Sequence, residues 1–283
     1  MEKGLIIKSI SGEYSIIKKN QEILVCKPRG VFRYKNLVPK VGDIVELENN
    51  TIVAILPRKN ELERPFIANV DKLFLVFSIE EPTFNSNLLD RILAINEYRN
   101  IESIIIVTKL DLLTDLSKYE HFFEYYKKIG YKVFFSDRDI EIIKKEIKDS
   151  IAVFAGQTGV GKTTLLNTIS GLKLKTSEVS IALGRGKHTT RHVELVRVKD
   201  GWIADTPGFG IVDFHEIDAL TLSHSFKEFF KYSENCKFSK CTHINEPNCY
   251  VKKMVEKNEI ISSRYDNYKL FIKEIEETKK NQY

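Results

Sequence analysis

A glycine-rich segment at residues 156–163 has the residue types needed to bind the phosphates of a nucleotide. Its sequence, GQTGVGKT, matches the pattern G-x-x-x-x-G-K-[ST] between an apolar stretch and a helical one. Glycines let backbone N–H groups face phosphate oxygens, a lysine neutralises the β and γ oxygens, and a hydroxyl offers a ligand to Mg²⁺. The predicted nucleotide contacts here are Gly156, Gln157, Thr158, Gly159, Val160, Gly161, Lys162, Thr163 and Thr164.

A second candidate phosphate contact lies downstream of this loop, in the segment WIADTPG at 202–208. A short apolar strand would end at Asp205, whose carboxylate suits the ligand shell of Mg²⁺. The backbone N–H of Gly208 would then lie where it can sense the γ-phosphate. Together with the glycine-rich loop, this segment is typical of a nucleoside triphosphatase.

The segment TKLD at 108–111 is a candidate for recognition of the base. It follows an apolar strand, and the ligands of parallel sheets bind at the carboxyl ends of the strands. It is similar to the N-K-x-D signature of GTPases, in which the aspartate accepts two N–H groups of guanine that adenine lacks. Thr108 stands in place of the usual Asn, which alters one supporting contact. The predicted base contacts are Thr108, Lys109, Leu110 and Asp111.

The order of these motifs differs from that of ordinary small GTPases, in which the phosphate loop comes first. A circularly permuted chain can build the same pocket, because a site is defined by geometry and not by sequence order. Permutation also places the C-terminal region directly after the strand that ends at Asp205. We therefore expect the nucleotide state to be relayed to residues 209–283.

A stretch rich in glycine, cations and hydroxyls, GRGKHTTRH at 184–192, has the composition of a switch loop. Thr190 is the favoured additional ligand of Mg²⁺ when a γ-phosphate is present. Phe209 stands where many GTPases have a glutamine that orients the attacking water. His188 is the candidate for that role, and the alternative is a histidine that faces solvent or RNA. The predicted catalytic residues are His188, Lys162 and Thr190, and the predicted Mg²⁺ ligands are Thr163, Thr190 and Asp205.

Three of the four cysteines lie within a short C-terminal segment together with a histidine. The pattern C-x4-C-x-H-x5-C supplies the Cys₃His set that suits one tetrahedral, structural Zn²⁺. The alternative is a coincidence of core cysteines. Cys26, alone in a predicted strand, is expected to be a core residue. The predicted zinc ligands are Cys236, Cys241, His243 and Cys249.

Strand-like and helix-like segments alternate through the region that carries the nucleotide motifs. Strands are expected at 71–79, 102–108, 131–136 and 151–156, and helices at 88–100, 118–130, 139–150 and 162–171. Such alternation produces right-handed crossovers and a mainly parallel sheet. We therefore predict a three-layer α/β P-loop GTPase domain, circularly permuted, over residues 66–220.

The regions on either side have different patterns. Residues 1–65 contain short strand-like segments at the spacing of a small barrel, for which an OB-like β-barrel fits and an SH3-like barrel fits nearly as well. This region holds 12 Lys+Arg against 8 Asp+Glu, so +4 of the net charge of +5 lies there, which permits contact with RNA phosphates. Residues 221–283 are expected to form a mostly helical zinc-binding domain.

Composition limits the cellular setting. Hydrophobic residues make up 42% and charged residues 29% of the chain, as in soluble globular proteins. No apolar run approaches the roughly 18 residues of a membrane span, and the N-terminal sequence lacks the pattern of a secretory signal. We expect a cytoplasmic protein without membrane contact, and nothing in the sequence demands more than a monomer.

The combination of motifs resembles the RsgA family of circularly permuted GTPases, also called YjeQ or YloQ. The resemblance extends from the barrel through RPFIANVDKL (64–73), TKLD, GQTGVGKTT, GRGKHTTRHVEL and DTPGF to the cysteine cluster. It implies that the three domains dock on the 30S ribosomal subunit and its 16S rRNA, and that the protein assists late maturation of that subunit. It also implies hydrolysis of GTP to GDP and phosphate, stimulated by the ribosomal particle, with Mg²⁺ as cofactor and His188 as the catalytic histidine.

Two other classes of function remain open on sequence grounds. One is an RNA-binding protein whose nucleotide site is largely inert or whose client is not the ribosome. The other is a P-loop ATPase or nucleoside kinase, in which TKLD is only a loop at the end of a strand. A kinase would need a lid that binds the phosphate acceptor, and no segment suggests one.

Overall fold

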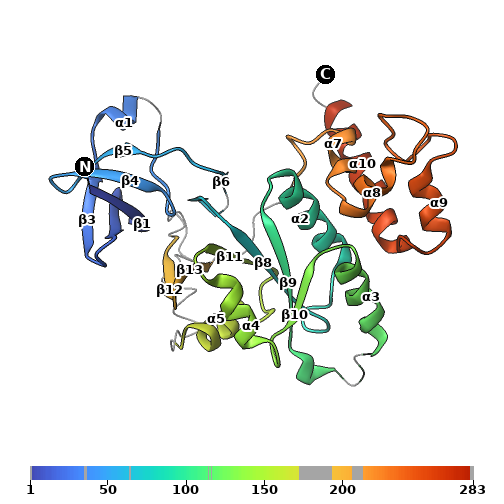
Figure 1. Ribbon diagram of the computed structural model, residues 1–283, viewed down its shortest axis with the longest axis horizontal. Helices are drawn as coiled ribbons and strands as arrows, with labels where there is room; N and C mark the ends of the chain where they lie inside the picture. The colour runs from blue at the N-terminus through green and yellow to red at the C-terminus, as the bar shows by residue number, and fades with distance from the viewer. Residues whose placement is uncertain are drawn as a thin grey trace.

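The computed structural model describes residues 2–34, 37–63, 65–113, 115, 117–171, 193–205 and 213–280. Figure 1 shows a β-barrel at the N-terminal end, an α/β domain in the middle and a group of helices at the C-terminal end. Among the described helices, none combines the length and the hydrophobicity that crossing a bilayer requires.

The N-terminal region is a closed five-stranded barrel with the order β1-β2-β3-β5-β4. Its strands are β1 (Glu2–Ile10), β2 (Glu13–Lys18), β3 (Ile23–Pro28), β4 (Ile44–Glu48) and β5 (Thr51–Ile55), with the short helix α1 (Val31–Tyr34) between β3 and β4. The β3–β5 pair is parallel and the other pairs are antiparallel. This five-stranded Greek-key order is that of the OB fold, so the OB-like barrel is confirmed.

Alternation of side chains explains the barrel. Ile6, Ile16 and Val45 lie on its strands and are fully buried, while the residues next to them in sequence are half-buried or exposed. Cys26 is 2% exposed and belongs to the same core, as predicted. Tight approach of the strands also requires Gly4, since a Cβ there would lie 2.3 Å from the Ile16 side chain.

The central domain is built on a six-stranded sheet with the order β10-β9-β8-β11-β13-β12. The strands are β8 (Lys72–Ser78), β9 (Glu102–Thr108), β10 (Lys132–Phe135), β11 (Ile151–Ala155), β12 (Leu195–Val198) and β13 (Gly201–Asp205). All neighbours are parallel except β12 and β13. The predicted mainly parallel sheet is confirmed, and the antiparallel edge strand β12 is an element that the sequence patterns missed.

Helices cover both faces of this sheet. They are α2 (Ser86–Tyr98), α3 (Ser117–Lys128), α4 (Ile140–Ile147) and α5 (Lys162–Ser170). Leu73, Leu75 and Phe77 of β8 share a core with residues of α2 and α3, whereas Phe74 and Val76 share one with residues of α4 and α5. Strict alternation along one fully buried strand therefore produces the three layers.

A small hairpin joins the barrel to the central domain. It consists of β6 (Glu61–Leu62) and β7 (Ile67–Ala68), and Ile67 also bridges to Val41 of the barrel. Asp43 is fully buried and accepts hydrogen bonds from the Arg58 guanidinium at 2.7 and 2.8 Å. Two-residue strands have too little periodicity to predict, and this hairpin was not expected.

The C-terminal region contains the helices α7 (Ala219–His224), α8 (Lys227–Ser233), α9 (Tyr250–Glu256) and α10 (Ser262–Lys280). The long helix α10 packs against α2 of the central domain. Arg264 of α10 is fully buried at this contact and forms ion pairs with Asp90 of α2, at 2.5 Å, and with Glu228 of α8. The mostly helical character of this region is confirmed.

Candidate functional site

The predicted nucleotide motifs lie at one edge of the central sheet. Strand β8 lies between β9 and β11, and the chain leaves this centre in opposite directions, through β9 to β10 and through β11 to β13. Such a point, outside the carboxyl ends of the strands, is where open α/β sheets bind ligands. TKLD begins at the end of β9 and the glycine-rich loop follows β11. The fold therefore brings the two predicted subsites to the same edge.

The glycines of the phosphate loop are required by its backbone. Gly156, Gly159 and Gly161 have φ angles of 147°, 89° and 93°, a region that side chains disfavour. At Gly156 there is also no space, because a Cβ would lie 2.1 Å from the carbonyl oxygen of Val76 in β8. These conformations turn the chain sharply from β11 into α5. The N–H groups in the first turn of a helix are suited to an anion, and the first turn of α5 follows this loop directly.

Lys162 opens α5 and is almost completely buried, at 9% exposure. Its ammonium group donates hydrogen bonds to the carbonyl oxygens of Gly156 and Gln157, at 2.8 and 2.7 Å. The positive charge is thus held over the loop that it follows. Gln157 is half-buried, whereas Thr158 and Thr164 are exposed and Val160 is buried.

The four residues of the base motif lie in three different settings. Thr108 is 4% exposed, and its hydroxyl lies 2.6 Å from the carbonyl oxygen of Val160. Lys109 adopts a left-handed φ of 58° and donates to the carbonyl oxygen of Glu81 at 2.6 Å. Leu110 and Asp111 lie in a single 3₁₀ turn, where the Asp111 side chain is exposed. The carboxylate is therefore accessible to a ligand.

The predicted Mg²⁺ ligands are only partly described. Thr163 lies in the first turn of α5 and is half-buried. The backbone of Asp205 ends β13 and pairs with Phe154 of β11, next to the phosphate loop. His188, Thr190 and Gly208 lie outside the described residues, as does the Asp205 side chain.

The four predicted metal ligands converge between α8 and α9. One ligand atom from each of Cys236, Cys241, His243 and Cys249 lies within 4.8 Å of the others. Nδ1 of His243 is 3.3 Å from the Cys249 sulfur and 3.8 Å from the Cys236 sulfur, and these two sulfurs are 4.0 Å apart. Two sulfur ligands of one tetrahedral Zn²⁺ lie about 3.8 Å apart, so the cluster fits that ion.

Hydrogen bonds fix the loop that carries these ligands. Glu246 accepts from the backbone N–H groups of Thr242 and Ile244 at 2.6 and 3.0 Å. Burial alone would raise the pKa of Glu246, but these bonds hold it below its usual value. The hydroxyl groups of Tyr265 and Tyr268 in α10 donate to the carbonyl oxygens of His243 and Thr242. Sequence patterns did not reveal these supporting residues, because none of them belongs to the spacing pattern of cysteines and histidine.

The electrostatics of the cluster also favour a bound cation. Burial lowers the pKa of His243 to about 4, which keeps its imidazole neutral and able to ligate a metal. Burial raises the pKa of the Cys241 thiol to about 12 and raises that of Cys249 as well. Thiolates at these positions therefore need a nearby positive charge, which a divalent metal supplies.

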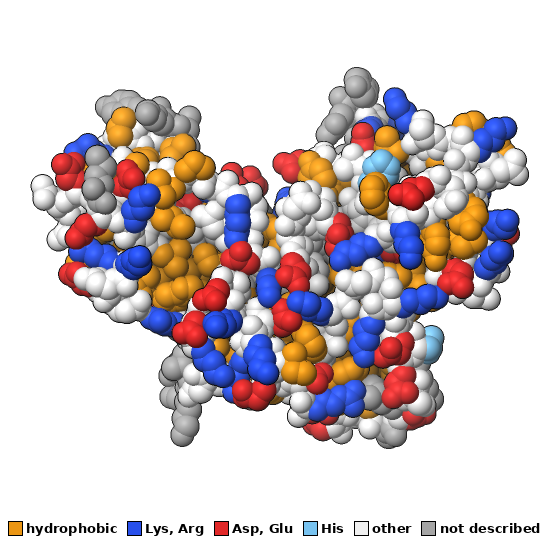
Figure 2. Space-filling view, viewed as in Figure 1, with side chains coloured by type: hydrophobic (Ala, Val, Ile, Leu, Met, Phe, Trp, Pro, Cys, Tyr) orange, Lys and Arg blue, Asp and Glu red, His pale blue; other side chains and the backbone are white. Residues whose placement is uncertain are grey.

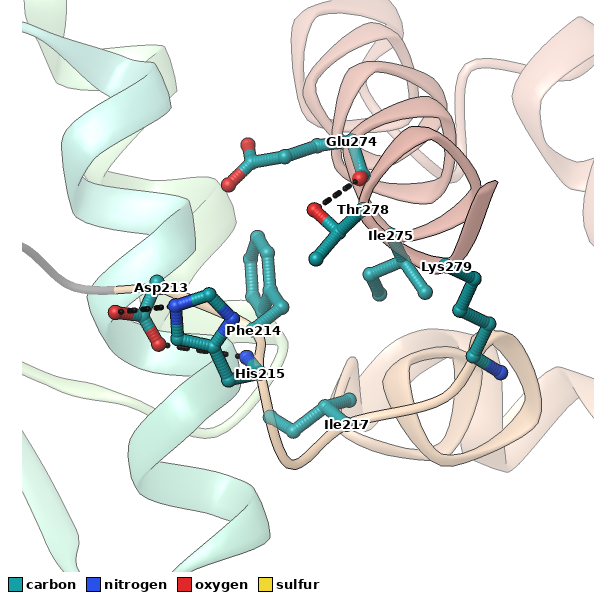
Figure 3. A pocket seen from close by; sticks show the side chains of 8 residues that line it. All are labelled: Asp213, Phe214, His215, Ile217, Glu274, Ile275, Thr278 and Lys279. Atoms are coloured by element: carbon teal, nitrogen blue, oxygen red, sulfur yellow. Dashed lines mark hydrogen bonds and ion pairs between the residues drawn. The ribbon is translucent and has the colours of Figure 1, made fainter. Parts of the chain in front are cut away.

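The C-terminal region also contains a small pocket. It has a volume of about 80 Å³ and is formed by residues 213–217 and the end of α10. Figure 3 shows Asp213 beside His215, whose Nε2 is 3.4 Å from the carboxylate. None of the predicted site residues lines this pocket, so it is not the predicted nucleotide site.

Similarity to known proteins extends over 99% of the chain. Residues 55–215 match the family model of the RsgA GTPase, and residues 3–52 match that of the RsgA N-terminal domain. A protein of Bacillus cereus named small ribosomal subunit biogenesis GTPase RsgA is 45% identical over 291 residues, which span 99% of both sequences. One of Listeria innocua, named small ribosomal subunit biogenesis GTPase RsgA 2, is 46% identical over 289 residues, again 99% of both.

Two solved structures have the same fold. A crystal structure described as YloQ, a circularly permuted GTPase, superposes with a TM-score of 0.83 at 38% identity, covering 98% of this chain and 96% of the other. YjeQ from Thermotoga maritima superposes with a TM-score of 0.84 at 34% identity, covering 97% and 98%. The similarity therefore includes the barrel, the central domain and the C-terminal helices together.

Proposed function

The chain belongs to the RsgA family of circularly permuted GTPases, and on that premise we propose that it acts in maturation of the small ribosomal subunit. It would bind the 30S subunit late in assembly and hydrolyse GTP to GDP and phosphate when that particle stimulates it. The observation that carries this proposal is the similarity to proteins named for this process over 99% of both sequences.

The nucleotide would lie across the edge where β8, β9 and β11 end. The phosphates would accept hydrogen bonds from the N–H groups of residues 156–164, with Lys162 neutralising the β and γ oxygens. Asp111 would accept the two N–H groups of guanine, because its carboxylate is exposed at the end of β9. The left-handed glycines of the phosphate loop support this assignment.

For hydrolysis, the residues present suit a Mg²⁺-dependent reaction. Thr163 and Asp205, with Thr190 in the GTP state, would hold the ion, which neutralises charge on the β and γ phosphates. His188 would orient the attacking water, a role that Phe209 cannot fill. Lys162 would stabilise negative charge that develops on the oxygens of the transferred γ-phosphoryl group.

We assign one structural Zn²⁺ to the Cys₃His cluster. All four ligand positions are filled by protein groups, so the ion would have no open position for a substrate. Its role would be to hold the loop between α8 and α9, which has little regular structure of its own.

The remaining assignments concern organisation and setting. We propose an RNA-binding barrel at 1–65, a GTPase domain at 66–220 and a zinc-binding domain at 221–283, acting as a cytoplasmic monomer on the 16S rRNA of the 30S subunit. The basic excess of the first region supports contact with rRNA phosphates. The β6–β7 hairpin spans the first of these boundaries, so the barrel and the GTPase domain would move together.

The test is GTP hydrolysis by the purified protein, alone and with purified 30S subunits. Controls are 50S subunits and ATP. The proposal is supported if 30S subunits strongly stimulate GTP hydrolysis, while 50S subunits do not and ATP is not hydrolysed. Weak turnover that 30S subunits do not change removes the ribosomal partner, and absence of turnover with every particle favours an RNA-binding protein with an inert nucleotide site.

A further inference from the structure

Thr108 lies where three elements of the nucleotide site meet. It is the last residue of β9 and pairs across the sheet with Ser78, the last residue of β8. Its hydroxyl lies 2.6 Å from the carbonyl oxygen of Val160 in the phosphate loop and 3.1 Å from that of Phe77 in β8. A Cβ on Gly161 would lie 4.0 Å from the same hydroxyl. The Thr108 side chain is thus enclosed by β8 and the phosphate loop.

The single proton of this hydroxyl limits what Thr108 can do. Both oxygens near it are backbone carbonyls, which only accept hydrogen bonds, so the hydroxyl is the donor in either contact. The shorter distance assigns the proton to Val160. No second proton remains to donate to a nucleotide base, and at 4% exposure the hydroxyl oxygen is poorly accessible as an acceptor.

We propose that Thr108 is a positioning residue that ties the base-recognition segment to the phosphate loop and does not itself bind the base. This inference rests on the proposed GTP site. It leaves Asp111 to recognise guanine, while the Thr108–Val160 hydrogen bond sets the separation between Asp111 and the N–H groups that bind phosphate. A ligand bound at both ends needs the two subsites at a fixed separation.

The opposite side of the β9 end is held independently. Lys109 donates to the carbonyl oxygen of Glu81, and the Ser78 hydroxyl donates to that of Pro82 at 2.8 Å. TKLD is therefore anchored to the loop after β8 even without the Thr108 hydroxyl. Loss of that hydroxyl should release the phosphate loop at Val160 and leave the base motif in place.

This predicts a specific pattern of nucleotide binding. Thr108→Val keeps the side-chain shape but removes the donor, so the affinities for GTP and GDP should both fall about 10-fold. The preference for GTP over ATP should stay unchanged, because Asp111 remains in place. KM for GTP should rise while kcat stays within about two-fold, as expected when an interaction common to ground and transition states is lost.

The experiment measures the affinities for GTP, GDP and ATP, steady-state hydrolysis with 30S subunits, and thermal unfolding for each variant. Thr108→Ser retains the hydroxyl and should restore affinity to within about two-fold of the original protein, and Thr108→Cys, a weak donor, should be intermediate. The matched control is Ser103→Ala in the same strand. Ser103 is also buried, but its hydroxyl accepts from Asn96 at 2.9 Å. That variant should lose stability and keep its nucleotide affinity.

Three results would overturn the inference. Unchanged GTP and GDP affinity in Thr108→Val would show that the bond to Val160 does not hold the site. A changed preference between GTP and ATP would mean that Thr108 contacts the base. Equal losses of nucleotide affinity in Thr108→Val and Ser103→Ala would show that the effect comes from impaired folding alone. If the unaltered protein binds GTP no better than ATP, the proposed GTP site itself fails, and this outcome is visible before any variant is made.

Discussion

The ammonium group of Lys162 is held in a confined position by carbonyl oxygens of the loop that precedes it. This placement keeps its charge within the loop whose N–H groups are the proposed phosphate contacts. Replacing Lys162 with Ala should lower GTP affinity about 10- to 100-fold, since a charge-assisted hydrogen bond contributes about 1.5–3 kcal/mol.

Titration with a fluorescent GTP analogue would measure this loss. Lys145→Ala is the control, because Lys145 is an exposed residue of α4. Equal affinities in the Lys162 and Lys145 variants would place the phosphates elsewhere.

Asp111 determines the choice of base if its carboxylate accepts two N–H groups of guanine. Asp111→Asn offers an amide in place of one acceptor oxygen, which mismatches guanine but suits the carbonyl group that xanthine has at the same position. GTP affinity should fall about 100-fold or more, and xanthosine triphosphate should become the preferred ligand.

Competition between the two triphosphates for the variant would test this. Asp149→Asn is the matched control, since Asp149 precedes β11 at the opposite edge of the sheet and its φ of 52° is acceptable to Asn. If Asp111→Asn still prefers GTP, Asp111 does not read the base.

Among the elements, α2 and α10 form a contact between the central domain and the C-terminal helices through buried charge. Burial alone would lower the pKa of Arg264, but the carboxylates of Glu228 and Asp90 hold it well above the usual value. Asp90 also accepts a hydrogen bond from Asn267 at 2.7 Å and one from the Tyr126 hydroxyl. Every charge in this network therefore has a partner of opposite sign.

Removing the cation should be costly. Arg264→Leu leaves two buried carboxylates without a counter-charge, which should lower the free energy of unfolding by about 3–5 kcal/mol. Denaturant unfolding would measure the change, with Lys269→Leu on an exposed part of α10 as control. Neutralising the partners as well, with Asp90→Asn and Glu228→Gln, should recover part of the loss. A loss below about 1 kcal/mol in Arg264→Leu would contradict this account.

The loop between α8 and α9 should depend on its metal. Cys241→Ser removes one of four ligands, so the zinc content should fall from about one ion per chain to near zero and the C-terminal helices should unfold at lower temperature. Elemental analysis and circular dichroism would follow the two effects. Cys26→Ala is a matched control, because it removes a buried thiol from the barrel and should leave the zinc content unchanged. Full zinc content in Cys241→Ser would exclude this cluster as the site.

Hydrophobic periodicity and motif spacing were sufficient to predict the helices and strands whose buried side chains form a continuous apolar pattern. The strand predicted at 102–108 has those bounds in the structure, and the helix predicted at 162–171 ends one residue earlier. The hairpin β6–β7 and strand β12 were not predicted. Such short elements bury too few residues to show a hydrophobic periodicity in the sequence. The four predicted zinc ligands were chosen from their spacing alone, and the fold brings these side chains together.

The sequence did not indicate which charged residues lie in the core. Asp90, Glu228 and Arg264 lie at helical positions where charge normally indicates solvent, and only the packing of three helices shows that they are buried. The role of Thr108 was equally hidden, since its partners are backbone carbonyls. The roles of His188 and Thr190 stay predictions.

At the scale of the whole molecule, a path of contacts leads from the nucleotide motifs to the C-terminal helices. The loop after β8 accepts a hydrogen bond from Lys109 and ends at Asn85, which caps α2 by accepting from Leu88 at 3.0 Å. Asn87 at the start of α2 donates to Asn267 of α10 at 3.1 Å. Figure 1 shows these helices side by side, far from the barrel.

Nucleotide state should therefore affect α2 and α10 more than the barrel. Hydrogen exchange in the GTP and GDP forms should differ at residues 86–98 and 262–280, where greater protection is expected with GTP, and should match within error at residues 2–28. Identical exchange along the whole chain would remove this path and with it the relay expected from the permuted order.

The burial of Cys26 has a practical consequence for chemical labelling. With zinc bound, three thiols would be metal ligands and the fourth is 2% exposed, so the native protein should react slowly with a thiol reagent. A single cysteine introduced on the surface would then carry a dye at one defined place, without removal of any natural cysteine. Because the natural thiols should react slowly while the metal is bound, the appearance of reactive thiols would measure the rate of metal loss.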